Sequence, residues 1–230
     1  LMSAWVTSSS SSIDAWIDRI EKNELRDLVV LPTKAFGSDE LDRLTAIFGD
    51  GISLRTLAAS GHAVSNKALW RFGSAVAVAS VSGHSQLEEL AIGDSALGDE
   101  GVVAFVDGLF SVQGGAKCCS LTKIDLSNKN IGIGGMNALN LLAEQSLLLK
   151  AVDLSRNSFK QVEGVELPLP SLMFPHFEDL NLSSCEIECS FAQTLFPRLF
   201  GSGGPPRTVR LSRNCIGDGG FSALMQSKAR

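Results

Sequence analysis

The sequence predicts an α/β solenoid of about seven similar units, with a curved parallel β-sheet on one side and helices and loops on the other. Two observations predict this fold class. Apolar residues alternate over 121–126, as in a short strand, and recur at helical spacing over 136–143. The same strand–turn–helix pattern returns along the chain at intervals of 28 to 34 residues. One such unit cannot bury both of its apolar faces alone, so we expect the units to stack on one another.

The repeats share an L-x-x-L-x-L strand pattern, and they begin near residues 25, 54, 87, 121, 149, 177 and 206. Three residues after each strand pattern comes a small or polar residue: Thr33, His62, Ser95, Lys129, Asn157, Cys185 and Asn214. Two positions further on we expect a buried apolar residue: Ala35, Val64, Leu97, Ile131, Phe159, Ile187 and Ile216. We therefore divide the chain into a flexible N-terminus plus capping helix over 1–24 and a repeat domain over 25–230.

Two segments have the clearest repeat pattern, LEELAIGDSALGDEG at 87–101 and VRLSRNCIGDGGFSAL at 209–224. They resemble the leucine-rich repeat family, and within it the long-repeat subtype of ribonuclease inhibitor. The resemblance implies a parallel sheet on the concave face, helices on the convex face, and a function in binding. It predicts the fold much better than the biochemistry, because this scaffold serves many functions.

Some repeats depart from the pattern. Those beginning at 87 and 54 are longer, and we expect the extra residues, including Cys118 and Cys119, to lie in the loop that returns from helix to strand. The fifth repeat has prolines at 168, 170 and 175, which favour an extended path over a helix. Its apolar segment 165–174 is a second candidate surface or packs onto the core. The last repeat lacks a polar capping unit, so we expect the array to be truncated at its C-terminus.

Composition excludes several classes of function. The net charge of −5 does not favour binding to nucleic acid or to an anionic membrane surface. No apolar run is long enough to span a bilayer, and no signal peptide is visible at the N-terminus. The five cysteines are odd in number and form no terminal cluster, so we expect reduced thiols and a cytoplasmic or nuclear protein.

The residues between the apolar strand positions point to the concave surface. At the central exposed position stand Val29, Ala58, Ala91, Asp125, Asp153, Asn181 and Arg210, so the surface changes from small and apolar through acidic to basic. Neighbouring strands lie about 4.8 Å apart, which makes Asp125 and Asp153 near neighbours of like charge. We expect the partner-binding residues of the concave face to be Glu89, Asp125, Asp153, Asp179, Asn181 and Arg210.

Chemical alternatives have weaker support. The aspartates could hold a divalent cation or act as an acid–base pair, but no loop completes a metal shell and the face is open to water. The glycines at 132–135 and 217–220 match no phosphate-binding motif. Cys185, Cys189 and Cys215 lack a fourth zinc ligand at a recognisable spacing, and the three histidines belong to no nucleophilic motif. We expect no enzyme activity, metal, cofactor or small-molecule substrate.

The sequence thus predicts a protein–protein interaction module or scaffold that binds a protein partner with a basic patch. An alternative is a regulator of a small GTPase, because the Ran GTPase-activating proteins resemble this repeat subtype. Their acidic tail is absent here, and no catalytic arginine can be assigned. Cytoskeletal regulators and immune-receptor sensors use the same repeats, and the sequence does not choose among them.

Overall fold

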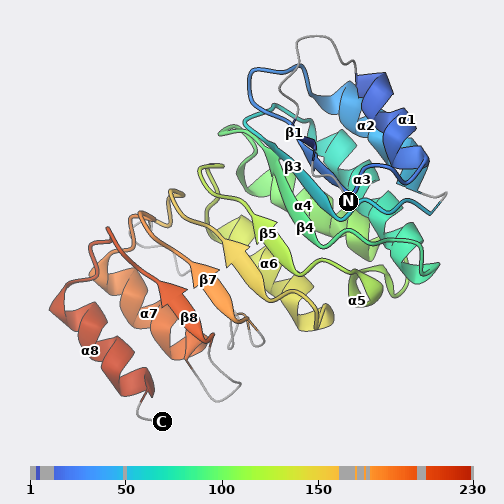
Figure 1. The fold of residues 1–230 in the computed structure, drawn as a ribbon. Coiled ribbons are helices and arrows are strands. Elements are labelled where there is room, and N and C mark those ends of the chain that lie inside the picture. The colour runs from blue at the N-terminus through green and yellow to red at the C-terminus, as the bar shows by residue number, and fades with distance from the viewer. Residues whose placement is uncertain are drawn as a thin grey trace.

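A computed structural model describes residues 4–5, 13–48, 51–160, 169, 174, 177–200 and 206–228. Within these ranges the strands form one parallel sheet in the order of the sequence, from β1 at one end to β8 at the other (Figure 1). The strands are β1 Ala4–Trp5, β2 Asp27–Val29, β3 Thr56–Ser60, β4 Glu89–Gly93, β5 Lys123–Asp125, β6 Ala151–Asp153, β7 Asp179–Asn181 and β8 Thr208–Arg210.

Helices cover one side of this sheet and leave the other side open (Figure 1). They are α1 Ile13–Glu21, α2 Ser38–Ile47, α3 Asn66–Val81, α4 Gly98–Phe110, α5 Gly115–Cys118, α6 Ile133–Gln145, α7 Cys189–Leu199 and α8 Gly217–Lys228. The arrangement confirms the predicted α/β leucine-rich repeat solenoid of about seven repeats. We call the uncovered side of the sheet the open face.

The core lies between the sheet and the helices. The middle apolar residue of each strand aligns with its neighbours across the sheet, as in Leu90 opposite Ile124 and Ile124 opposite Val152. All three side chains are buried, and full burial of a side chain of this kind stabilises the fold by about 1.5–3 kcal/mol. In the helical layer of the core, α3 and α4 pack so closely that a Cβ atom on Gly73 would lie 2.3 Å from the carbonyl oxygen of Phe105. Only glycine permits that approach.

Several local expectations were wrong. Ala35 is exposed, and the next residue, Phe36, is buried in its place with its ring 5.5 Å from that of His62. The turn after β2 is thus one residue longer than the repeat pattern assumes. The pair at 118–119 does not lie in a loop throughout, because α5 ends at Cys118 and Cys119 is fully buried. The sequence also predicted no strand at Ala4–Trp5, where β1 pairs with β2.

Most of the outer side of the fifth repeat lies outside the described residues, including the three prolines and most of the segment 165–174. Two residues of that segment are described, and both face the core. Leu169 is partly buried against it, and Phe174 is fully buried with its ring 4.6 Å from that of Phe177. The Phe174 N–H also donates to the buried Asn140 side chain at 2.6 Å. These two residues therefore pack inward rather than form a surface.

Candidate functional site

The register of the sheet arranges the outward-pointing side chains of the open face in two rows. The first row contains Asp27, Thr56, Glu89, Lys123, Ala151, Asp179 and Thr208. The second row contains Val29, Ala58, Ala91, Asp125, Asp153, Asn181 and Arg210. The open face therefore holds all six residues expected from the sequence.

The structure brings four of those residues together. Asp125, Asp153, Asn181 and Arg210 occupy adjacent places of the second row on strands β5 to β8. The amide of Asn181 donates to Asp153 Oδ2 at 2.9 Å. Glu89 does not join this group, because it lies in the first row on β4. The second row of the site is thus a continuous run of four residues at the C-terminal half of the sheet.

A local turn at the end of each strand fixes these side chains. Asp125 Oδ1 accepts a hydrogen bond from the Ser127 N–H at 2.9 Å, and Asp153 Oδ1 accepts one from the Ser155 N–H at 2.8 Å. Asn181 does the same with Ser183 at 3.1 Å. A short Asp or Asn side chain that bonds to the backbone two residues on stabilises a turn. The repeated Asp/Asn-Leu-Ser triplet in the sequence is the signal from which this role could have been predicted.

Ion pairs within the open face neutralise part of the expected charge gradient. Lys123 Nζ lies 3.4 Å from Glu89 Oε2, and Arg210 contacts the Asp179 carboxylate. All four side chains remain largely exposed, so each pair contributes little to stability. Their effect on recognition is larger, because Glu89 and Asp179 no longer present unbalanced negative charge. Lys123 is not among the site residues expected from the sequence, although its place beside Glu89 follows from the register.

The remaining negative charge lies at Asp125 and Asp153, which stand side by side on the adjacent strands β5 and β6. We call this pair the acidic centre. The hydrogen-bond partners of Asp153 are neutral groups, a backbone N–H and the Asn181 amide. Asp125 interacts electrostatically with Lys129, whose side chain is buried. Desolvation lowers the pKa of Lys129, and the negative charges of Asp125 and Asp94 oppose that effect.

A buried ladder of side chains holds the turns beside the open face. Asn157 Oδ1 accepts from the N–H groups of Lys129 and Ile131, both at 2.9 Å, and its amide donates to the carbonyls of Leu126 and Leu154, both at 2.8 Å. Asn214, two repeats after Asn157, makes the same four contacts with its own repeat and the preceding one. Between them, the Cys185 thiol donates to the Leu154 carbonyl at 3.0 Å. These residues occupy the position that the repeat pattern singled out.

The glycine-rich turns have a packing role. Asp99 on α4 accepts hydrogen bonds from the N–H groups of Gly132 at 2.6 Å and Gly134 at 3.0 Å, at the start of α6. A Cβ atom on Gly134 would approach Asp99 Oδ2 to 2.7 Å, which explains the glycine there. Gly220 likewise has no room for a side chain against Ala192. At 132–135 the Asp99 carboxylate of the preceding repeat already accepts the N–H groups that a phosphate would need.

The cysteines differ in their surroundings. All five are free, and burial raises the pKa of both Cys119 and Cys185 to about 11. Cys118 and Cys215 are exposed. Among the described residues, no group of three or more histidine, cysteine or acidic side chains could hold a metal ion. His62 is buried and His84 is exposed, while His176 lies outside the described residues. In the part of the chain that the structure describes, no helix is long and apolar enough to cross a bilayer.

Comparison with known proteins agrees with the repeat assignment. A family model described as Leucine Rich repeat matches residues 84–106 and 207–225. A solved structure named Leiomodin-1 Actin-Binding Site 2 aligns over 96% of this chain and 90% of its own length, at 13% identity and a TM-score of 0.43. No curated protein matches the sequence. The family matches at 84–106 and 207–225, together with the register of the sheet and the ladder of turn residues, support the leucine-rich repeat fold of this chain.

Proposed function

We propose that this chain is a protein-binding module whose open face receives a basic patch of a protein partner. The observation that supports this proposal is the acidic centre, where Asp125 and Asp153 lie opposite each other in adjacent strands. Two carboxylates at this spacing repel each other. A lysine or arginine of a partner would relieve that repulsion, and complementary charge of this kind favours the correct partner and accelerates association.

The surroundings of the acidic centre suit a protein rather than a small molecule. On strands β2 to β4 the second row continues as Val29, Ala58 and Ala91, which are half-buried and uncharged. An apolar strip beside a charged group resembles the mixture of apolar and polar contacts found in protein interfaces. The proposal requires no cofactor and no catalysis by this chain. A partner would contact the strip and the acidic centre together.

The test uses the double variant Asp125→Asn with Asp153→Asn. Asparagine removes the charge but keeps an oxygen that can accept the turn hydrogen bond, as Asn181 does at the equivalent position. The matched control is Asp18→Asn with Asp107→Asn, which makes the same change in net charge at exposed helix positions. We expect partners captured from a lysate at physiological salt to be lost from the first variant and retained by the control.

Retention of the same partners by both variants would refute the open-face proposal. The identity of a captured protein also tests the alternative of a small-GTPase regulator, which stays a prediction from the resemblance. Purified partner would then be titrated at two salt concentrations. A weaker salt dependence for the Asp125→Asn, Asp153→Asn variant than for the wild type is expected, because screening acts on the charges that this variant lacks. A cytoplasmic or nuclear location likewise stays a prediction.

A further inference from the structure

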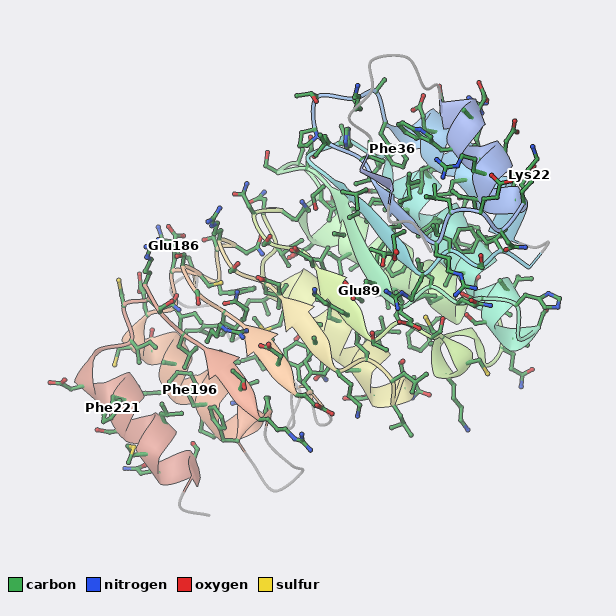
Figure 2. The ribbon with its side chains drawn as sticks, viewed as in Figure 1. Lys22, Phe36, Glu89, Glu186, Phe196 and Phe221 are labelled. Carbon is green, nitrogen blue, oxygen red and sulfur yellow. The ribbon has the colours of Figure 1, made fainter. Side chains whose placement is uncertain are left out.

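A polar groove runs along the turns that follow strands β4 to β7, beside the open face but separate from the acidic centre. Its volume is about 440 Å³, and its lining includes Ser95, Asn128, Asn130, Arg156, Ser184 and Glu186. These residues come from four successive repeats. Figure 2 places Glu186 among these turns, far from Glu89 at the start of β4. We call this feature the turn groove.

Hydrogen bonds between repeats hold the turn groove in shape. The Asn128 N–H donates to the Ser155 carbonyl, and the Arg156 N–H donates to the Ser183 carbonyl, both at 2.9 Å. The buried Asn157 side chain anchors the turn from below through its contacts with Leu126 and Leu154. A ligand in this groove would therefore meet a preorganised backbone, which reduces the entropy lost on binding.

The charges of the turn groove are unbalanced. Its acidic residue, Glu186, already accepts a hydrogen bond from the Ser158 hydroxyl at 2.5 Å and lies 3.6 Å from Lys160 Nζ. The guanidinium of Arg156 is exposed and has neither an ion pair nor a hydrogen bond among the described residues. Arg156 is thus a cation without a counter-ion, in a groove whose single acidic group is occupied.

The neutral lining residues can donate hydrogen bonds. The side chains of Asn128, Asn130 and Ser184 make no hydrogen bond within the described part of the chain, although their hydroxyl and amide groups are donors. A guanidinium binds a carboxylate through two parallel hydrogen bonds, and adjacent amides can bind the remaining oxygen lone pairs. This combination of donors suits an anionic side chain.

We propose that the turn groove binds a carboxylate side chain on an extended segment of a protein partner, with Arg156 as the residue that pairs with the carboxylate. The site does not depend on the acidic centre and selects the opposite charge. A partner that used both surfaces would present a basic patch to the sheet and an acidic segment to the turns. Because the chain as a whole is acidic, with a net charge of −5, attraction of an acidic peptide requires a local site.

The test measures binding of a fluorescein-labelled oligoglutamate peptide of about six residues by fluorescence anisotropy at low salt. The variant is Arg156→Gln. The matched control is Arg213→Gln, because Arg213 stands in the same Leu-Ser-Arg-Asn sequence, has a φ of 58° against 60° for Arg156, and is also exposed, yet it does not line the groove. We expect Arg156→Gln to weaken binding about tenfold or more, as loss of a charge-assisted pair implies, and Arg213→Gln to change it less than twofold.

Two further arms identify the ligand chemistry and separate the two proposals. An oligoglutamine peptide should not bind, and binding of a phosphoserine peptide without binding of oligoglutamate would overturn the assignment to a carboxylate. The Asp125→Asn, Asp153→Asn variant should bind oligoglutamate at least as tightly as the wild type. Absence of oligoglutamate binding, or equal weakening by Arg156→Gln and Arg213→Gln, would overturn the turn-groove proposal and leave the open-face proposal standing.

Discussion

The substitution Asn157→Ala tests the repeat architecture at a buried side chain that joins two adjacent repeats. The Asn157 amide forms four hydrogen bonds of 2.9 Å or shorter, two accepted from N–H groups and two donated to carbonyls, and the residue is 4% exposed. Alanine would remove the Asn157 partner from all four backbone groups, of which the Leu154 carbonyl keeps the Cys185 thiol as a donor. Each unsatisfied buried group costs about 1–3 kcal/mol, and water that enters the new space restores part of the loss. We expect the free energy of unfolding to fall by about 4 kcal/mol.

Asn214→Ala is the matched control. Asn214 makes the same pattern of contacts, to Cys185, Ile187, Leu182 and Leu211, but it is only half-buried in the last repeat. Water can reach the orphaned groups there, so we expect a loss of about 1–2 kcal/mol. Urea unfolding followed by circular dichroism measures both values. A loss below about 1 kcal/mol for Asn157→Ala, or one no larger than that for Asn214→Ala, would refute the role assigned to the ladder.

Three other predictions concern packing, capping and thiol chemistry. Asp99→Ala removes two hydrogen bonds at the start of α6 and should lower the free energy of unfolding by about 1–2 kcal/mol, measured by urea titration. Gly73→Ala places a Cβ atom 2.3 Å from the Phe105 carbonyl oxygen and should cost about 2–3 kcal/mol, measured as a lower Tm. At pH 8, iodoacetamide should modify Cys118 much faster than Cys185, because Cys185 is buried and its pKa is about 11, as mass spectrometry of timed samples would show.

The two buried thiols should also make the stability of the folded chain depend on pH. Cys119 and Cys185 have a pKa of about 11 in the folded chain, above the ordinary value of 9.0. The unfolded chain therefore loses these protons first, so the stability that they contribute is complete below pH 9 and declines as the pH rises towards 11. Stability that did not fall between these pH values, or rapid alkylation of Cys185 in the native state, would contradict the burial of these thiols. Unchanged unfolding of Asp99→Ala or Gly73→Ala would contradict the helix contacts.

The repeat period predicted the sheet and most of the helices because both depend on a regular apolar pattern. The burial of Leu97, Ile131, Phe159 and Ile187 followed directly from that pattern. The predicted burial of Ala35 was wrong because a longer turn places Phe36 at the buried position instead. A shift of this kind leaves no periodic signal in the sequence.

A different reason explains why the sequence did not predict the short elements β1 and α5. β1 has only two residues, and its pairing with Leu28 and Val29 is a tertiary contact rather than a local preference. α5 is a four-residue helix that begins at Gly115, and glycine disfavours helix. Neither element has enough residues to show a period of 2 or 3.6.

The candidate site was predicted in outline, since the alternation of a strand decides which residues face outward. The ion pairs that neutralise Glu89 and Asp179 were harder to predict from the sequence. The contact of Glu89 with Lys123 follows from the register of adjacent strands, but the contact of Asp179 with Arg210 joins different rows of the sheet. That diagonal contact depends on the reach and rotamer of a long side chain, which sequence alone does not specify.

Site-specific photocrosslinking shows directly whether a partner binds the open face. A photoreactive residue at Ala151 would stand on β6 between Lys123 and Asp179, whereas one at Val103 would stand on the exposed side of α4. Neither position belongs to the acidic centre. We predict covalent adducts with the captured partner from position 151 and none from position 103. Adducts from position 103 alone would show that the partner binds the helical side and not the open face.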